Sequence, residues 1–338
     1  MTPPKRLTQQ DIARMAGVSQ TTVSMVLNNR TDTEVRIAPE TRDRVLRVIR
    51  ETGYIADPAA RRLAERRNRI IGVFTYEAVF PSASADFYHP FLLGIEERAE
   101  DAGCDLLLFT SAKAASGERR RIFNADSRVR LADGCVLLGR TVDRDDLARL
   151  LAEGFPFVSI GRRDDAGGPV PYVGVDYPPA VRALVERVRA LGHTRLAYVG
   201  AGEGGESRTD RMRGFRDAAG PEALHLPVAE GGHGRILDEL SAAGVTAVFV
   251  EEPADGACLT EAAEARGLSV PGDLSILVLG TPDRRPGFTG FRIPRREIGW
   301  RAVELLTEIL ERGGTPQELL PCEPVEGTTL AAPRDRKA

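Results

Sequence analysis

The chain begins with short segments whose apolar positions recur at helical spacing. Thr8 and Asp11 stand three residues apart, as in a capping box, which predicts that a helix starts at this point. Gly17 is expected to end this helix, because glycine adopts the positive φ of a tight turn without strain. The apolar residues in between, which predict the buried face of the helix, are Ile12, Ala13 and Ala16.

A second helix is predicted over residues 20–28, after a four-residue turn. Ser19 stands where its hydroxyl can cap this helix. Helix, four-residue turn and helix is the spacing of a helix-turn-helix motif. Its inner face would consist of Val23, Val26 and Leu27. The outward positions are short or polar, apart from Met25, and can enter a major groove. Together with the capping residues Thr8 and Ser19, the predicted DNA contacts of the head are Gln20, Thr21, Thr22, Ser24, Met25 and Asn28.

A third helix is predicted to begin near Pro39, a residue that suits the first helical turn. Gly53 closes it. Its apolar face consists of Val45, Leu46, Val48 and Ile49. This pattern by itself is not specific, because a packed surface hairpin of helices would show it too.

From Arg69 onward short apolar runs alternate with helical segments. This rhythm predicts two parallel sheets covered by helices on both faces. No glycine-rich phosphate-binding motif stands at a strand-to-helix turn, which argues against a dinucleotide or nucleoside-triphosphate enzyme. The predicted strands cover residues 70–76, 106–110, 134–138, 157–160, 196–200, 247–250 and 274–279, and the predicted helices 91–102, 180–191, 212–219 and 260–266.

Length, composition and charge narrow the class of protein. The 338 residues, 42% apolar and 28% charged, fit a soluble globular protein of two or three domains. No stretch approaches the ~20 apolar residues of a membrane span, and no signal-peptide core follows the start, so we expect a cytoplasmic protein without a membrane partner. Residues 1–69 hold 14 basic and 8 acidic residues, net +6, and the remainder is net −9. A basic head suits a polyanionic partner, although chance clustering of surface arginines is an equally good reading of charge alone.

Cysteine and histidine offer little material for metal binding or catalysis. Cys104, Cys135, Cys258 and Cys322 show neither metal-ligand spacing nor the density of a disulfide scaffold, which favours buried, reduced thiols. His193, which precedes an apolar run, is expected to serve packing. We find no Ser/His/Asp order, paired catalytic carboxylates or metal cluster, so we expect no enzymatic activity, no metal and no cofactor.

Three consecutive stretches carry a resemblance to a known family. The runs DIARMAGVSQTTVSMVLN, APETRDRV and GYIADPAARRLA resemble, in order and spacing, the amino-terminal domain of the LacI/GalR family of bacterial transcriptional regulators. The resemblance implies that Gln20 and Thr21 hold the leading base-reading positions of the recognition helix. Met25 departs from the family, which usually has an arginine there. A bidentate guanine contact is therefore missing, and the operator should differ from the commonest family palindrome.

The stretch Pro58–Ala64 resembles the hinge helix of the same family. The resemblance implies that Leu63 of each subunit enters the minor groove and that Ala60 allows close approach. A paired apolar wedge unstacks a base step and kinks the duplex. Arg61 and its neighbouring arginines would neutralise phosphates. A plain amphipathic linker helix is the alternative interpretation.

The rest of the chain resembles the ligand-binding body of this family, a periplasmic-binding-protein fold of two lobes joined by crossing strands. The resemblance lies in FYHPFLLGIEERAEDAGCDLLLFT, ALGHTRLAYVG, DRMRGFRDA and RIPRREIGWRAVELL, so that nearly the whole chain is covered. It implies an α/β protein with an all-α helix-turn-helix domain at residues 1–56, a hinge helix and linker at 57–69, and a ligand-binding and dimerisation body at 70–338. The amino-lobe would span about 70–171 and 290–321, and the carboxy-lobe about 172–289 and 322–332.

In such a body a small ligand lies between the lobes, at the carboxyl ends of the strands. Arg211 matches the ligand-gripping arginine of the family, and its planar fork suits hydroxyls, carboxylates or phosphates, with a surface ion pair as the alternative. Phe87, Tyr88 and Phe91 lie where the family places aromatic residues against the ligand. A core role suits Phe91 equally well.

Further candidate ligand contacts follow other strand-like runs. Arg162 and Asp176 stand at cleft-facing positions, with a surface salt bridge as the alternative. Where the family usually has Asn-Asp after the strand ending at residue 250, this chain has Glu252 and a proline, and residues 280–282 are Gly-Thr-Pro where an aspartate commonly binds sugar hydroxyls. An ordinary hexose is therefore not expected, and Glu251 or Glu252 could accept from a hydroxyl or a cationic group.

These observations predict a ligand-responsive, sequence-specific DNA-binding transcriptional regulator. Its partners would be a palindromic double-stranded operator, a small polar effector that is sugar-like or related, and a second copy of the chain. A repressor associated with the nucleoid is the expected form. A solute-binding protein without a regulatory role is the alternative, since the body alone would fit one, but a DNA-binding head stands where an export signal would be.

Overall fold

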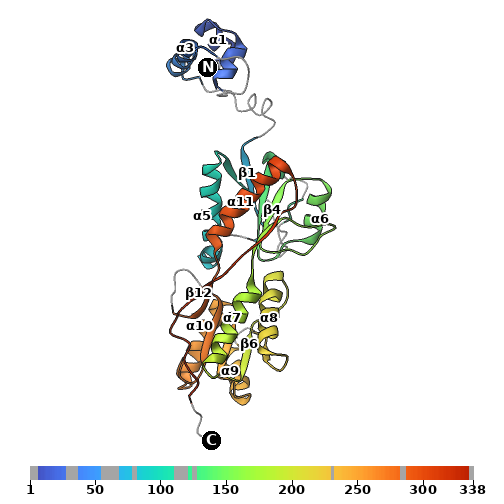
Figure 1. Ribbon diagram of the computed structural model, residues 1–338, viewed down its shortest axis with the longest axis vertical. Helices are drawn as coiled ribbons and strands as arrows, with labels where there is room; N and C mark the ends of the chain where they lie inside the picture. Colours follow the sequence, from blue (N-terminus) through green and yellow to red (C-terminus); the bar gives the residue numbers. More distant parts are fainter. Residues whose placement is uncertain are drawn as a thin grey trace, which may run out of the picture. The chain divides into compact units, whose positions relative to one another are not determined.

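The computed structural model describes residues 7–27, 37–54, 68–77, 82–109, 121–123, 128–229, 232–281 and 287–334. The chain forms two compact units, Met1–Asn68 and Arg69–Ala338, which we call the head and the body and describe separately (Figure 1). None of the described helices is long and apolar enough to cross a membrane.

The described part of the head contains three helices, α1 (Gln9–Ala16), α2 (Gln20–Leu27) and α3 (Pro39–Thr52). The predicted capping box is confirmed: the Thr8 hydroxyl accepts from the Asp11 amide at 3.3 Å, and the Asp11 carboxylate accepts from the Thr8 amide at 3.0 Å. Gly17 has a φ of 62° and ends α1. The three helices share one small core of Ile12, Ala13, Ala16, Val23, Val26, Val45 and Tyr54.

Ser19 caps α2 as predicted, because its Oγ accepts from the Thr22 amide at 3.1 Å. The helix-turn-helix arrangement predicted from spacing is therefore confirmed. Asn28, the predicted last residue of α2, lies outside the described residues. So do Ala60, Arg61 and Leu63 of the predicted hinge helix.

The amino-lobe of the body is a six-stranded parallel sheet with helices on both faces. Its strand order is β11-β5-β4-β3-β1-β2, and every neighbouring pair is parallel. The helices α5 (Ser82–Asp101) and α11 (Arg295–Arg312) lie side by side on one face, and α6 (Arg144–Ala152) packs on the other (Figure 1). The strands are β1 (Ile70–Thr75), β2 (Asp105–Phe109), β3 (Gly134–Leu138), β4 (Phe157–Ile160), β5 (Tyr172–Val175) and β11 (Gln317–Leu320), with a 3-10 turn η1 (Val129–Leu131) before β3.

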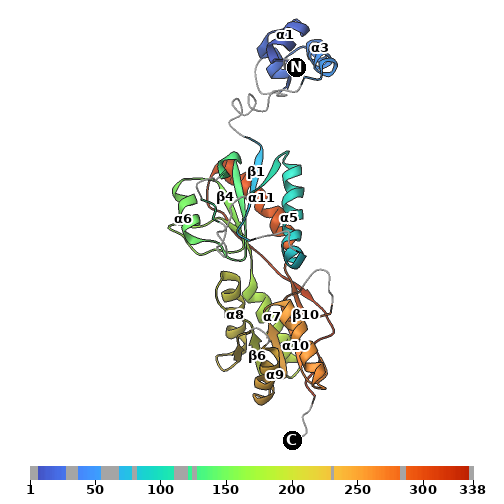
Figure 2. The same ribbon diagram turned by 180° about the vertical axis from the view of Figure 1, so that it is seen from behind.

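The carboxy-lobe has the same construction, with the strand order β12-β10-β9-β8-β6-β7. All its neighbouring strands are parallel except β12, which runs antiparallel to β10. Helices α7 (Tyr177–Ala190) and α8 (Glu206–Ala219) pack on one face, and α9 (His233–Ala242) and α10 (Pro253–Ala265) on the other (Figure 2). The strands are β6 (Leu196–Val199), β7 (Leu224–Leu226), β8 (Ala247–Val250), β9 (Ser275–Thr281), β10 (Thr289–Arg292) and β12 (Glu323–Val325).

The boundaries predicted between the lobes are wrong by a few residues. Strand β5, expected in the carboxy-lobe, pairs with β4 and β11 in the amino-lobe sheet. Strand β10, expected in the amino-lobe from residue 290 onward, pairs with β9 in the carboxy-lobe sheet. The chain therefore crosses after Val175, after Arg292 and after Leu320. A short buried strand is apolar on both faces, so its sequence does not indicate which of two sheets it joins.

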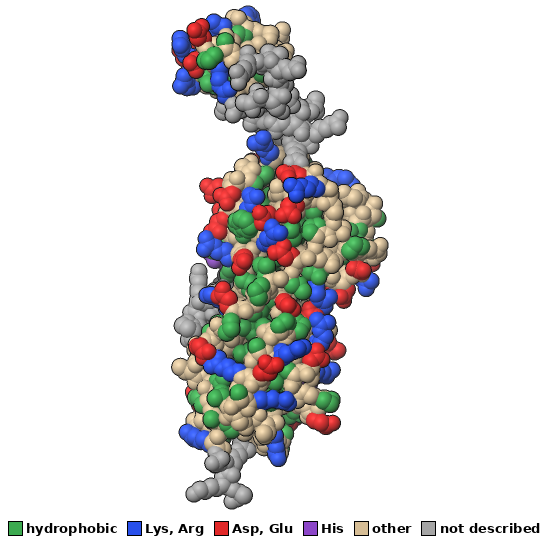
Figure 3. Space-filling view, in the orientation of Figure 1, with side chains coloured by type: hydrophobic (Ala, Val, Ile, Leu, Met, Phe, Trp, Pro, Cys, Tyr) green, Lys and Arg blue, Asp and Glu red, His purple; other side chains and the backbone are tan. Residues whose placement is uncertain are grey.

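Two further local predictions need correction. Helix α5 begins at Ser82 rather than at residue 91, and Pro90 lies inside it. The prediction failed because a proline before an apolar periodic segment reads as the first turn of a helix. Cys258 is exposed on α10, so the four thiols are not all buried. On the face of the body in Figure 3, acidic and basic side chains are interspersed, so the net negative charge of the body does not form one patch there.

Candidate DNA-contacting surface and ligand cleft

The predicted DNA-contacting residues of the head that the structure describes are all at least partly exposed. Helix α2 turns Val23 and Val26 into the core. This leaves Gln20 and Thr21 exposed, and Thr22 partly exposed with its hydroxyl 2.9 Å from that of Ser19. Thr8 and Ser19 are also exposed, and Ser24 and Met25 are partly so. The capped start of α2 is therefore open to a partner.

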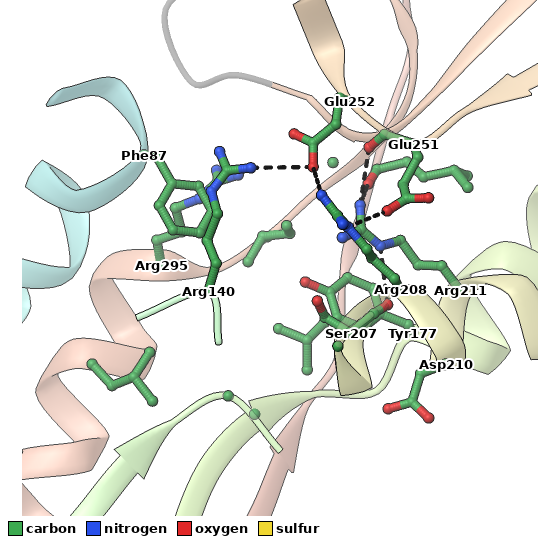
Figure 4. Close-up of a pocket in the computed structure, with 18 of the residues that line it drawn as sticks. Phe87, Arg140, Tyr177, Ser207, Arg208, Asp210, Arg211, Glu251, Glu252 and Arg295 are labelled. Atoms are coloured by element: carbon green, nitrogen blue, oxygen red, sulfur yellow. Dashed lines mark hydrogen bonds and ion pairs between the residues drawn. The ribbon is translucent and has the colours of Figure 1, made fainter. Parts of the chain in front are cut away.

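The body contains a cavity of about 680 Å³ between its two lobes (Figure 4). Its wall includes segments that follow β3, β4 and β8 and the last residues of β9, at the carboxyl ends of the strands where parallel sheets place ligand sites. The structure brings six of the eight predicted ligand contacts to this wall. They are Phe87, Phe91, Arg162, Arg211, Glu251 and Glu252.

Tyr88 and Asp176 do not line the cavity. Tyr88 is only 2% exposed, and its hydroxyl donates to Glu77. Successive residues of a helix point about 100° apart, and here Tyr88 enters the core of the body while Phe87 lines the cavity. Asp176 precedes α7 without capping it, and its amide donates to the Leu320 carbonyl at 2.9 Å. Sequence position alone did not reveal either orientation.

Arg211 is held in place from three sides. Its Nε donates to the Ser207 carbonyl at 3.1 Å, and its Nη1 donates to the carbonyls of Glu251 and Leu279 at 3.0 and 2.9 Å. The guanidinium lies 4.9 Å from the centre of the Tyr177 ring. Burial disfavours the charge, yet the surrounding tyrosines and glutamates raise the pKa of Arg211. It is a fixed cation, and none of these contacts uses its Nη2.

The two neighbouring glutamates have different surroundings. Glu251 is 1% exposed: its Oε2 accepts from the Gly202 amide at 2.8 Å and from the Tyr198 hydroxyl at 3.2 Å, and its Oε1 lies 2.8 Å from Arg208 Nε. Burial raises the pKa of Tyr198, which keeps this hydroxyl a donor. Both carboxylate oxygens of Glu251 therefore already have partners within the protein.

Glu252 lies between arginines from opposite lobes. Its Oε1 is 3.2 Å from Arg140 Nη1 of the amino-lobe and 3.7 Å from Arg208 Nη2 of the carboxy-lobe (Figure 4). The side chain of Glu252 keeps 30% of its surface exposed. The Arg140 guanidinium also lies 4.5 Å from the centre of the Phe87 ring. Glu252 is thus the more accessible carboxylate of the two.

A second pair of contacts joins the lobes through α8. Arg162 donates to both carboxylate oxygens of the buried Asp210, at 2.6 and 3.2 Å, and to Asp164 at 2.6 Å. Burial opposes its charge, but these hydrogen bonds raise the pKa of Arg162. Arg163 lies 3.2 Å from Glu206, and burial lowers the pKa of Arg163 although Glu206 opposes this. Both arginines follow β4, so one segment links the amino-lobe to α8.

Several residues that line the cavity were not among the predicted ligand contacts. Arg140, Arg208 and Arg295 all stand just after a strand or in the first turns of a helix, which is the signal that could have found them. Because arginine is common throughout this chain, that position alone did not separate them from surface residues. The other lining residues with a polar group that were missed are Glu77, Thr141, Arg163, Tyr177, Ser207 and Asp210.

Three family descriptions match the chain. "Bacterial regulatory proteins, lacI family" matches residues 8–57, "Periplasmic binding proteins and sugar binding domain of LacI family" matches residues 75–230, and "Periplasmic binding protein-like domain" matches residues 185–330. The HTH-type transcriptional regulator CelR of Thermobifida fusca is 30% identical over 325 residues, which cover 90% of this chain and 92% of CelR. The chain belongs to the lacI family of bacterial regulatory proteins. It is a DNA-binding transcriptional regulator rather than an enzyme.

Other relatives of this LacI-family regulator agree. Catabolite control protein A of Staphylococcus xylosus is 27% identical, and the match covers 93% of this chain and 96% of that protein. The lac repressor dimer bound to operator and the anti-inducer ONPF superposes with a TM-score of 0.74 at 22% identity, over 97% of this chain and 100% of that one. The CelR–cellobiose complex superposes with a TM-score of 0.62 at 23% identity, and the match covers 96% of this chain and 100% of that one. These structures confirm the predicted fold, and nothing among the relatives supports a solute-binding protein without a regulatory role.

Proposed function

We propose that this LacI-family regulator is a repressor that binds a palindromic operator as a homodimer and responds to a small polar effector in the body cleft. The observation that carries this proposal is Arg211, a buried cation fixed in a cavity of about 680 Å³ on the same chain as a helix-turn-helix head. A cavity of this volume suits a small molecule. The regulator would act in the cytoplasm, bound to the nucleoid.

The effector would lie between the lobes. Phe87 and Phe91 offer apolar faces, and Arg162, Arg211 and Glu252 are polar groups of the same wall. Arg162 and Glu252 already join the two lobes through ion pairs, so a ligand that competes for them changes how the lobes are held together. The relative CelR was solved with cellobiose, which supports a polar effector of this general size.

In the head, Gln20 and Thr21 would read base edges in the major groove. The family description over residues 8–57 and the exposure of both side chains support this role. Hinge contacts at Ala60, Arg61 and Leu63 remain proposals from the resemblance. The other proposed contacts in the head are Thr8, Ser19, Thr22, Ser24, Met25 and Asn28.

The test of base reading uses an operator selected from random duplex DNA with the full chain. Gln20→Ala and Thr21→Ala should each lose about 1–3 kcal/mol on this operator and little on random DNA, because base contacts specify while phosphate contacts do not. Gln10→Ala, an exposed glutamine on α1, is the matched control. Equal losses on both DNAs would make the two residues backbone contacts. A tight complex of one chain with a non-palindromic site would contradict the homodimer.

Leu63→Ala tests the hinge. Removing the apolar wedge should weaken operator binding and reduce the bend of the DNA, because the cost of opening a base step is no longer offset. Operator affinity and bend angle are measured on circularly permuted fragments, with random DNA as the control. An unchanged bend would identify Pro58–Ala64 as a plain linker.

A further inference from the structure

The wall of the cleft is rich in arginine. Among the described residues that line it, six are arginines and four are carboxylates, and two carboxylates outside the lining, Asp164 and Glu206, pair with Arg162 and Arg163. The arginines come from both lobes, and Figure 4 shows several of them pointing into the same space. They are Arg140, Arg162, Arg163, Arg208, Arg211 and Arg295, and the carboxylates are Glu77, Asp210, Glu251 and Glu252.

The carboxylates do not neutralise this wall evenly. Asp210 is occupied by Arg162, and the buried Glu251 by Arg208. Arg211 has backbone carbonyls and the ring of Tyr177 as partners, and no carboxylate of the described residues forms an ion pair with it. Arg211 therefore adds a charge that no ion pair of the described residues neutralises, and it lines the same wall as Arg140 and Arg208, which share Glu252.

The N-terminal ends of four helices also make the electrostatic potential in the cavity more positive. Residues in the first turns of α7, α8, α10 and α11 all line the cavity, for example Tyr177, Ser207, Pro253 and Arg295. The N-terminal end of a helix carries a partial positive charge. Four such ends on one cavity favour an anion in addition to the arginines.

The anion would bind where the carboxylate of Glu252 now lies. Its single oxygen Oε1 is shared by Arg140 and Arg208, which come from opposite lobes and can each bind an oxygen with a charge-assisted hydrogen bond. Its side chain keeps 30% of its surface exposed, so solvent reaches this carboxylate. The sequence alone suggested that Glu252 accepts from the ligand, but in the structure this carboxylate is already held by the protein.

We propose that the effector is anionic: a polyhydroxylated molecule that bears a carboxylate or phosphate. Its acidic group displaces Glu252 as the partner of Arg140 and Arg208, while Arg211 binds neighbouring oxygens. This rests on the proposed function, in which the cleft is the effector site. The acidic group bridges the two lobes in place of Glu252. Neutral sugars cannot form this bridge, so they bind more weakly.

The first experiment compares acidic ligands with their neutral parents. Thermal unfolding of the full chain is followed with gluconate, glucuronate and glucose 6-phosphate against glucose, with galactonate and galacturonate against galactose, and with ribose 5-phosphate against ribose. At least one acidic compound should raise the melting temperature above that of its parent at equal concentration, because binding to the native state stabilises it. The carboxylate and phosphate arms identify which acid is used. Equal effects of parent and acid, or no effect of any acid, would overturn the proposal.

The second experiment uses variants whose effects have opposite signs. With the stabilising acid, Arg140→Gln should weaken binding by about tenfold or more, since a charge-assisted contact is lost. Glu252→Gln should leave binding equal or stronger, because the competing carboxylate is gone. Arg182→Gln, an exposed arginine on α7 outside the cavity, is the matched control. Weaker binding of the acid to Glu252→Gln would contradict the displacement.

Operator binding separates this proposal from the function on which it rests. If a neutral sugar and not an acid changes affinity for the selected operator, the effector is not anionic and the repressor function stands. If the wild-type chain shows no preference for any selected duplex over random DNA, the proposed function itself fails. Both readings use the same full-length protein and the same DNA.

Discussion

His193 shows how one side chain fastens distant parts of the carboxy-lobe. It is 2% exposed and lies between the Thr246 hydroxyl, 2.8 Å from its Nδ1, and the Ala331 carbonyl, 2.7 Å from its Nε2. A carbonyl only accepts, so Nε2 carries the proton and Nδ1 accepts from Thr246. The packing role expected from sequence is therefore confirmed. Burial lowers the pKa of His193, partly opposed by the bond to Ala331.

This shift predicts a dependence of stability on pH. The histidine of the unfolded chain takes up its proton near pH 6.5, whereas the folded protein binds it only at lower pH. The stabilisation is therefore present above about pH 6.5 and is lost as the pH falls from there through the folded pKa. Thermal unfolding of wild type and His193→Gln between pH 8 and pH 5 measures it. The variant should lose less stability on acidification, and identical pH profiles would exclude His193 as the cause.

At the scale of elements, α5 and α11 pack with their backbones almost in contact. A Cβ added at Gly94 of α5 would lie 1.8 Å from the Arg296 carbonyl oxygen, and one at Gly299 of α11 would lie 2.1 Å from the Phe91 carbonyl oxygen. Only glycine permits this approach. The crossing brings Phe87 and Arg295 to the same end of the cavity, where the guanidinium is 5.4 Å from the centre of the ring.

Gly94→Ala should therefore destabilise the body. Alanine is intrinsically better than glycine in a helix by about 1 kcal/mol, but overpacking the crossing should cost about 1–3 kcal/mol or more. Urea unfolding of the full chain gives the free energies. Gly168→Ala is the control, because its Cβ would meet only Leu151, at 4.0 Å. Should Gly94→Ala be as stable as this control, the helices do not pack as closely as described.

At the scale of the molecule, the two lobes of the body are coupled by ion pairs across the cleft. The contact of Arg162 with Asp210 is the best aligned of them, with two hydrogen bonds to a carboxylate whose side chain is only 3% exposed. Gly174 lets strand β5 lie close to the backbone of Arg162, since a Cβ at this position would lie 2.6 Å from the Arg162 amide nitrogen. The pair therefore links α8 to the end of the amino-lobe sheet.

Asp210→Asn should lower the free energy of unfolding by about 1.5–3 kcal/mol, the range for hydrogen bonds to charged groups. The amide keeps the shape of the carboxylate but donates where Arg162 also donates. Asp217→Asn, an exposed position on the same helix, is the matched control. Denaturant unfolding of the full chain measures both variants. Equal stability of the two would show that the pair across the cleft contributes nothing.

The local structure of this protein follows from short-range patterns in its sequence. The capping box at Thr8, the turn at Gly17 and the period of the apolar positions predict the head helices, because each depends on residues within one or two turns of each other. The fully apolar runs predict parallel strands with helices between them. Arg211 and Glu252 were found as ligand candidates by their place in motifs resembling the LacI/GalR family.

Which segments meet is visible only in the folded chain. The structure places β5 and β10 in the lobes opposite to those expected, turns Tyr88 away from the cavity, and sets Glu252 between Arg140 and Arg208. Periodicity encodes whether a residue is buried and in which kind of element. The partner of a buried charge depends instead on where the chain crosses between two sheets, and that is set by packing between residues far apart in the sequence.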